Sequence, residues 1–257
     1  EYINAKGTEE LKKLFNMERA IFDYSKPVKL IYDLMLMSNV KDDEIVMDFF
    51  SGSSTTAQAV MQMNADKGGN RKFIMIQLPE ETDQKSEAYK AGYKNICDIG
   101  KERIRRAGKK ILDENPEAKD ELDIGFRVLK VDTTNMQDVY YNPAEYKQDM
   151  LSKLEDNIKP DRTPEDLLFQ VMLDLGVLLS SKIEEINIQG KKVFNVADGY
   201  LIACFDNDVT SEVITEVAKK QPYYAVFRDS SLANDSVVTN FEQIFQTYSP
   251  TTVRKVL

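Results

Sequence analysis

The stretch Asp48-Phe49-Phe50-Ser51-Gly52-Ser53-Ser54-Thr55-Thr56-Ala57 joins a short apolar run to a segment with helical periodicity. The apolar run, residues 45–50, predicts a strand, and residues 55–63 place Ala57, Val60 and Met61 on one helix face. Small residues between these elements let the backbone approach a bound molecule, and a helix start offers free N–H groups. The stretch therefore predicts an α/β fold with a ligand site at the carboxyl end of a strand.

The surrounding sequence extends this into a strand–helix–strand unit. A second strand is expected at residues 72–78, which are apolar enough to be buried on both faces, and Pro79 ends it. The short crossover predicts that the two strands are parallel. Upstream, Lys26-Pro27 opens an apolar helix, with Pro27 in the first turn. Downstream, a long helix is expected from about residue 96 to residue 114.

The pattern changes near Asp132, where Thr, Asn and Pro residues predict a loop-rich connector. Beyond it, Thr163-Pro164 predicts the start of a helix that runs to Gly176. Strands are expected at 183–188, 192–197, 200–205, 223–228 and 251–256, and helices at about 211–220 and 237–246. The chain is therefore expected to hold two α/β domains, residues 1–132 and a smaller unit at 133–257.

The composition excludes several classes of site. The 257 residues include no histidine, so neither a Ser-His-Asp triad nor an HExxH zinc site can be built from them. Cys97 and Cys204 are too few for a zinc cluster, and we expect reduced core thiols and no metal. No signal peptide or membrane-length apolar run is evident, which favours a cytoplasmic protein without a membrane partner.

The charge is unevenly distributed along the chain. Residues 1–132 carry 22 basic and 24 acidic side chains, whereas residues 133–257 carry 12 and 19, within a net charge of −9. Contact with a phosphate backbone requires a basic face, so any nucleic acid contact is expected in the first half. There, six basic residues between Lys101 and Lys110 form either a phosphate-binding helix face or an ordinary solvated one.

The strand-end stretch, residues 48–57, does not match the known sequence patterns of nucleotide-binding loops. A P-loop needs Gly-Lys-Ser/Thr, and no lysine follows Gly52. A dinucleotide fingerprint needs three spaced glycines, and only Gly52 is present. Taken alone, the stretch is also compatible with an ordinary tight turn between a strand and a helix.

Several segments, taken in order, resemble one enzyme family. They are residues 22–31 (FDYSKPVKLI), 48–57 (DFFSGSSTTA), 70–81 (NRKFIMIQLPEE), 102–106 (ERIRR), 123–128 (DIGFRV) and 227–231 (FRDSS). This set resembles the methylase (Mod) subunit of type III restriction-modification systems, adenine-N6 DNA methyltransferases of the permuted β class. The resemblance implies a partial Rossmann-like methyltransferase sheet followed by a smaller C-terminal α/β domain.

The resemblance also implies S-adenosylmethionine as cofactor and assigns residues to it. Lys26 and Pro27 belong to the helix motif that precedes the cofactor strand, and Asp48 would face the methionine amino group. The rest of the loop would line the pocket: Phe49, Phe50, Ser51, Gly52, Ser53 and Ser54, where Ser54 replaces a second glycine of the family pattern. Gln77 stands where related enzymes place an acid on the ribose hydroxyls, and Glu80 is a nearby substitute.

The family's Asp/Asn-Pro-Pro-aromatic catalytic motif is missing from this sequence. The nearest string, Asn142-Pro143-Ala144-Glu145-Tyr146, lacks the second proline and is better explained as a turn. The resemblance therefore implies the C-terminal part of a methylase, inactive alone and exposing an edge or apolar surface. Its partners would be DNA in the intact enzyme, a second methylase subunit and the restriction (Res) subunit.

Two alternatives to a cofactor-binding enzyme fragment stay open. The chain could be a non-catalytic assembly module for methylase dimerisation or Res binding, in which residues 51–54 are only a structural turn. It could also be an unrelated nucleotide-binding protein, which would prefer ATP or NAD.

Overall fold

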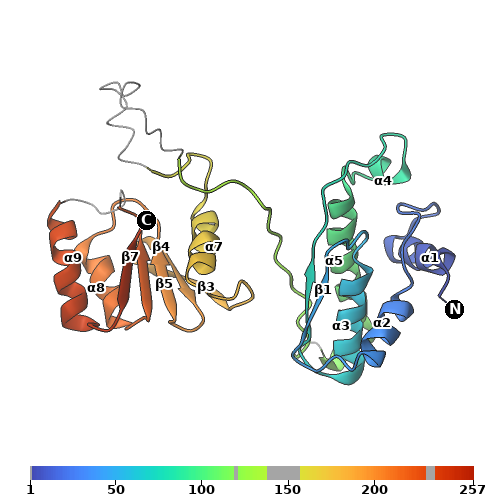
Figure 1. Ribbon diagram of the computed structural model, residues 1–257, viewed down its shortest axis with the longest axis horizontal. Helices are drawn as coiled ribbons and strands as arrows, with labels where there is room; N and C mark the ends of the chain where they lie inside the picture. Colours follow the sequence, from blue (N-terminus) through green and yellow to red (C-terminus); the bar gives the residue numbers. More distant parts are fainter. Residues whose placement is uncertain (1, 119–120, 138–156, 230–234) are drawn as a thin grey trace. The chain divides into compact units, whose positions relative to one another are not determined.

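The computed structural model describes residues 2–118, 121–137, 157–229 and 235–257. The chain divides into two compact units, Glu1–Leu129 and Lys130–Leu257, whereas the predicted boundary was residue 132 (Figure 1). Both units combine helices and strands, so the predicted α/β class is confirmed. No helix within the described ranges is both long enough and apolar enough to span a membrane.

The first unit contains two parallel strands and a group of helices. Along the chain these are α1 (Asn4–Phe15), α2 (Val28–Met37), β1 (Ile45–Asp48), α3 (Thr55–Lys67), β2 (Lys72–Met75), α4 (Glu87–Lys90), α5 (Ile96–Glu114) and η1 (Pro116–Ala118). Strands β1 and β2 pair in parallel from Ile45 opposite Lys72 to Asp48 opposite Met75. The predicted strand–helix–strand unit is thus confirmed.

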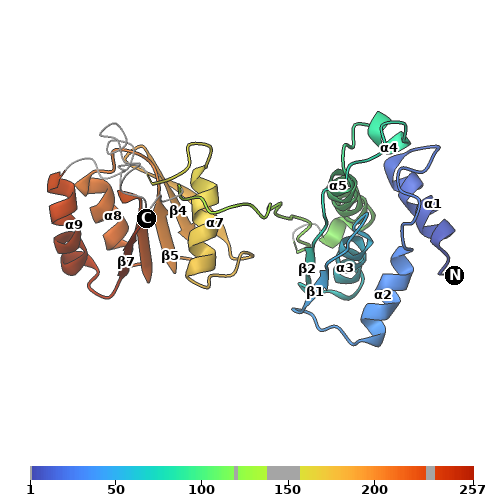
Figure 2. The same ribbon diagram turned by 45° about the horizontal axis from the view of Figure 1, so that its top comes forward.

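The two faces of the β1–β2 sheet differ in burial. Val46, Phe73 and Met75 lie on the inner face and pack on the apolar side chains of α3 and α5. The outer face carries Ile45, Met47 and Ile74, which are 56%, 56% and 41% exposed. Figures 1 and 2 show why, because the helices of this unit lie on one side of the sheet. The prediction that residues 72–78 are buried on both faces is therefore wrong, and this exposed surface is called the outer sheet face below.

Other boundaries in this unit also differ from the predictions. Both strands end earlier than expected, at Asp48 and Met75, because the chain then turns into the loops that follow. Pro27 caps α2 in an extended conformation, with φ −63° and ψ 138°, rather than lying in its first turn. Helix α1 was not predicted; its N-cap makes no side-chain hydrogen bond, so the usual start signal is missing.

The second unit is a five-stranded sheet with helices on both faces. Its elements are α7 (Pro164–Asp174), β3 (Ile183–Ile188), β4 (Lys191–Val196), β5 (Leu201–Cys204), α8 (Ser211–Lys219), β6 (Tyr224–Phe227), α9 (Asp235–Tyr248) and β7 (Val253–Val256). The strand order is β3-β4-β5-β6-β7; the first two pairs are antiparallel and the last two parallel. Each element matches a predicted one to within two residues at its start and its end.

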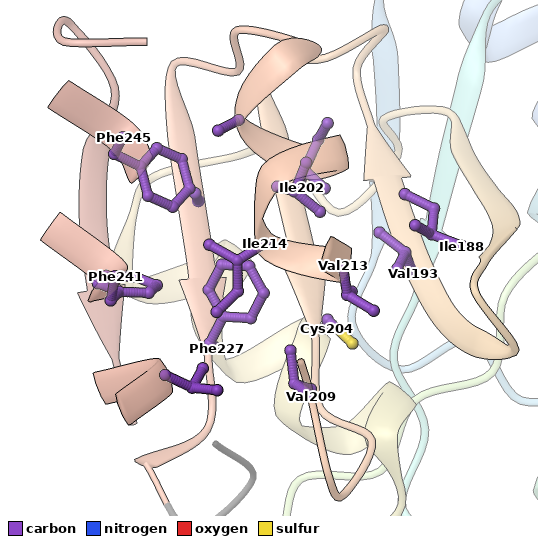
Figure 3. Packing of buried hydrophobic residues seen from close by; sticks show 14 residues of the cluster. Ile188, Val193, Ile202, Cys204, Val209, Val213, Ile214, Phe227, Phe241 and Phe245 are labelled. Atoms are coloured by element: carbon purple, nitrogen blue, oxygen red, sulfur yellow. The ribbon is translucent and has the colours of Figure 1, made fainter. Parts of the chain in front are cut away.

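Two apolar clusters hold this sheet between its helices. One joins α8 and α9 to the sheet through residues such as Ile214, Phe227, Phe241 and Phe245 (Figure 3). The other joins α7 to the opposite face through Leu168, Phe194 and Val226, among others. Cys204 lies in the first cluster and is fully buried, as expected for a core thiol, whereas Cys97 of α5 is only half-buried.

Candidate ligand site at the carboxyl end of β1

The loop between β1 and α3 makes its turn with two residues of positive φ. Gly52 has φ 50° and Ser54 has φ 58°, both in the left-handed region. The Ser54 N–H donates to the carbonyl of Ser51 over 2.7 Å and closes the turn. Glycine adopts this conformation freely, but a serine is strained in it. The position where the family pattern expects a second glycine thus has the backbone conformation that favours one.

The carboxylate of Asp48 is half-buried and held from two sides. One oxygen accepts a hydrogen bond of 2.6 Å from the Thr56 hydroxyl, and the other accepts one of 3.3 Å from the Phe50 N–H. In the part of the chain that the structure describes, no basic side chain forms an ion pair with Asp48. An oriented carboxylate without a partner cation is suited to binding an ammonium group.

The segment after β2 is tied directly to the loop. The Gly52 N–H donates to Oε1 of Gln77 over 2.8 Å, so the two predicted site residues meet. Nε2 of Gln77 donates to the Leu78 carbonyl over 3.2 Å. Glu80 is exposed, and its carbonyl accepts from the Ile96 N–H at the start of α5.

The remaining loop residues divide into exposed rings and buried hydroxyls. Phe49 and Phe50 are 63% and 77% exposed, with ring centroids 5.4 Å apart. Ser51, Ser53 and Ser54 are buried. A hollow of about 520 Å³ lies elsewhere in the unit, lined by Met35, Asp42 and Arg71 among others, and no predicted site residue borders it.

Lys26 and Pro27 reach the loop through their backbone rather than through the lysine side chain. The Lys26 ammonium donates to Asn4 over 3.0 Å, in α1. The Lys26 carbonyl accepts a hydrogen bond of 3.3 Å from the hydroxyl of Thr55, at the start of α3. Pro27 is buried.

Arg103 is the residue of this site that sequence reasoning missed. Its side chain is fully buried, and Nη1 donates to the hydroxyls of Ser25, Ser53 and Thr55 over 2.8, 2.9 and 2.7 Å. Burial lowers the pKa of Arg103 to about 10, and the charge of Glu10 acts in the opposite direction. The guanidinium is therefore still charged at neutral pH. Helix periodicity contained the signal, because Arg103 lies four residues from both Ile99 and Ala107 on the buried side of α5.

The basic run on α5 does not lie wholly on one helix face, because Arg103 is buried. Arg103 points inward, and four of the other five basic residues pair with acids of the same helix. These pairs are Lys101–Asp98, Arg105–Glu102, Arg106–Glu102 and Lys110–Glu114. Such exposed pairs contribute little to stability, but they reduce the positive charge available to a phosphate backbone.

Two sequence features lie outside the described residues. The string Asn142-Pro143-Ala144-Glu145-Tyr146 falls within residues 138–156, and Ser230 and Ser231 of the 227–231 segment fall within residues 230–234.

The part of the chain that builds this loop matches known methylases. Residues 3–105 match the family model described as DNA methylase. The Mod subunit of the type III restriction-modification enzyme EcoP15I from Escherichia coli is 34% identical over 254 residues, 93% of this chain. The chain is a relative of the type III Mod subunits. The EcoPI Mod subunit of Escherichia phage P1 is 32% identical over 96% of the chain, and StyLTI Mod of Salmonella typhimurium is 37% identical over 52%.

These relatives confirm the resemblance stated from the sequence motifs. The chain spans about a third of the length of the first two Mod subunits, 34% and 36%. The DNA methylase match includes β1, the strand-end loop, β2 and the part of α5 that carries Arg103.

Proposed function

We propose that residues 1–129 form part of the S-adenosylmethionine site of an adenine-N6 DNA methyltransferase of the type III Mod kind. The observation that carries this proposal is Asp48, which is oriented by Thr56 and Phe50 and has no partner cation among the described residues. It lies at the carboxyl end of a parallel strand, inside the segment that matches DNA methylases. The parallel β1-α3-β2 unit supports a Rossmann-like arrangement, in which ligands bind at this end of the sheet.

The residues present suit the parts of this cofactor. Asp48 would bind the methionine ammonium group, and the exposed rings of Phe49 and Phe50 would border the pocket beside the loop. Gln77 and Glu80 would receive the ribose hydroxyls, with Gln77 exchanging its bond to the Gly52 N–H for one to the ligand. Ser51, Gly52, Ser53 and Ser54 would shape the loop, and the Lys26–Pro27 backbone would support it. When bound, the cofactor supplies the methyl group.

The outer sheet face supports a partial methyltransferase sheet. An apolar strand surface usually packs against further elements, because its exposure leaves apolar area in water. We propose that the rest of the methylase covers this face in the intact enzyme and supplies the catalytic motif and the DNA target recognition. The described chain would then bind cofactor but not methylate DNA alone. We also propose a cytoplasmic location, where such an enzyme would meet cellular DNA.

Calorimetry with S-adenosylmethionine and S-adenosylhomocysteine tests the cofactor proposal. Asp48→Asn keeps the shape of the side chain and removes its charge. Because a charge-assisted hydrogen bond is lost, the variant should bind S-adenosylmethionine at least about tenfold more weakly than the wild type. Asp43→Asn, in the exposed turn before β1, is the matched control and should bind like the wild type. Equal binding by the wild type and the Asp48 variant, or a preference for ATP or NAD, would contradict the proposal.

For residues 130–257 we propose a protein-interaction role, which is also the alternative function of the whole chain. Tyr200 and Tyr223 are exposed and stack nearly parallel, 3° apart with centroids 5.1 Å from each other. Exposed tyrosines are typical of protein interfaces. A second Mod subunit and the Res subunit are the proposed partners.

Alanine substitution of both tyrosines in the full-length protein tests this role. Weaker dimerisation or Res binding in sedimentation experiments is expected, whereas Tyr24→Ala, an exposed tyrosine of the first unit, should have no effect. If both assemblies persist unchanged, the interaction surface lies elsewhere.

A further inference from the structure

Arg103 bonds to four side chains that lie 45 to 78 residues away from it in the sequence. Its Nη1 bonds Ser25 before α2, Ser53 in the strand-end loop and Thr55 at the start of α3. Its Nε donates to Gln58 of α3 over 2.9 Å. Ser53 and Thr55 flank the strained Ser54, so the guanidinium holds the loop on both sides of its left-handed residue.

The burial of this charge is not explained by stability. Among the described residues, no carboxylate lies within ion-pair distance of Arg103, and its Nη2 is buried without a hydrogen-bond partner. Only the more distant charge of Glu10, among these residues, acts on the guanidinium. A buried charge without an ion-pair partner is costly, and an apolar side chain of similar size is often at least as stable. The three hydroxyls also have hydrogen-bond partners other than Arg103, because the Ser25 hydroxyl oxygen lies 3.1 Å from that of Ser53 and 3.5 Å from that of Thr55.

The backbone of the loop is held by bonds of Ser51, Gly52 and Ser54, whereas the side chain of Ser53 bonds to Ser25 and Arg103. Ser54 caps α3 without a side-chain hydrogen bond, and it occupies a conformation that serine does not favour. Gly52 adds a flexible position two residues earlier. The hydrogen bonds that reach the loop from Gln77 and Arg103 therefore help to select its shape.

We propose that Arg103 is a positioning residue, whose fork to Ser25, Ser53 and Thr55 sets the binding shape of the strand-end loop before the cofactor arrives. This inference rests on the proposed function for its ligand, S-adenosylmethionine, but not for its effect on the loop. Preorganisation of this kind strengthens binding, because the ordering cost has been met during folding.

Arginine is specifically suited to this task. Its planar guanidinium presents Nε to Gln58 and Nη1 to the three hydroxyls at the same time. The single ammonium of a lysine cannot occupy both places. Arg103→Lys should therefore keep the charge and restore only part of the positioning.

Hydrogen–deuterium exchange of the whole chain tests the effect on the loop. In Arg103→Met, loss of the bonds to the charged group predicts roughly tenfold faster amide exchange in residues 51–57. The amide exchange rates in β3 to β7 should stay unchanged. The free energy of unfolding should not fall. Arg106→Met is the matched control, because Arg106 lies on the same helix and bonds Glu102 and the Phe15 carbonyl instead of the loop.

Calorimetry on the same variants gives the second readout. Arg103→Met should bind S-adenosylmethionine about tenfold more weakly than the wild type at equal stability, and Arg103→Lys should lie between them. A side chain with only a structural role would lower the stability and leave the affinity of the folded protein unchanged. If the amides of Arg103→Met exchange rapidly throughout the first unit, the same measurement on Arg103→Lys tests the proposal. Fast exchange confined to the loop in Arg103→Lys supports it.

The two proposals fail in different ways. If the wild type binds no S-adenosylmethionine while Arg103→Met still loosens residues 51–57, the proposed function is wrong and the positioning role stands. If the wild type binds and both Arg103 variants keep its affinity and its loop exchange, the positioning role is wrong.

Discussion

At the residue scale, the strand-end loop depends on a glycine of another element. A Cβ added to Gly100 in α5 would lie 2.6 Å from the Ser54 hydroxyl and 3.4 Å from the Gly52 carbonyl. The absence of a side chain at position 100 therefore makes room for the left-handed serine. Two positions 46 residues apart, Ser54 and Gly100, are coupled by this close approach.

A double-mutant cycle measures this coupling. Alanine is a better helix former than glycine by about 1 kcal/mol, so Gly100→Ala should be stabilising where space allows. In the wild type the collision with Ser54 should cancel that gain, whereas in the Ser54→Gly background the gain should appear. We expect a coupling energy of roughly 1 kcal/mol from urea unfolding. An equal effect of Gly100→Ala in both backgrounds would contradict the proposed contact.

At the element scale, α7 begins as its sequence predicts. The Thr163 hydroxyl accepts from the Asp166 N–H over 3.3 Å. The Asp166 carboxylate accepts from the Thr163 N–H and from the Thr163 hydroxyl, both over 2.8 Å. These bonds stabilise the charged carboxylate and hold the pKa of Asp166 below its ordinary value. The cap therefore stabilises the folded state above the unfolded pKa of about 4 and loses this effect as the pH falls through the lower folded value.

Removing this cap should have a pH-dependent cost. Asp166→Ala is expected to lower the free energy of unfolding by about 1 kcal/mol at pH 7, because the Thr163 N–H loses its acceptor. The difference from the wild type should shrink as the pH falls below the unfolded pKa of about 4 and through the lowered folded pKa of Asp166. Urea unfolding at pH 7 and pH 2.5 measures both values. Asp161→Ala, an exposed acid just before the cap, is the control, and a pH-independent cost for Asp166→Ala would refute the explanation.

At the scale of the whole molecule, each unit encloses its own apolar core, but the first leaves one sheet face uncovered. Neighbouring residues of β2 show the contrast. Phe73 packs into two apolar clusters on the inner face of the sheet, whereas Ile74 and, just after the strand, Ile76 are exposed. The outer sheet face is the expected site for packing of further methylase elements or, in their absence, for self-association.

Threonine substitution at Ile74 and Ile76 should reduce self-association and the fluorescence of a bound hydrophobic dye such as ANS. Both changes keep a β-branched side chain, and the free energy of unfolding should change by less than about 0.5 kcal/mol per site. Phe73→Ala, on the opposite face of the same strand, should instead cost about 2–4 kcal/mol. A large loss of stability from the outward substitutions would show that this face is already covered.

The sequence by itself determined most of the elements and pointed to the candidate site. Short apolar runs predicted β1 and β2, helical periodicity predicted α3 and α5, and the small residues after Asp48 located the loop. Such signals lie within about ten neighbouring residues, so they can be read without the fold. The capping box of α7 was predictable for the same reason.

Only the tertiary structure decided which of these residues are buried and what they contact. Arg103 reads as one member of a basic run, yet its hydroxyl partners are 48, 50 and 78 residues away. The apolar residues of β2 predict two buried faces, yet helices cover only one. Burial depends on which distant segments pack against a residue, and long-range packing of this kind is not encoded in the local spacing of the sequence.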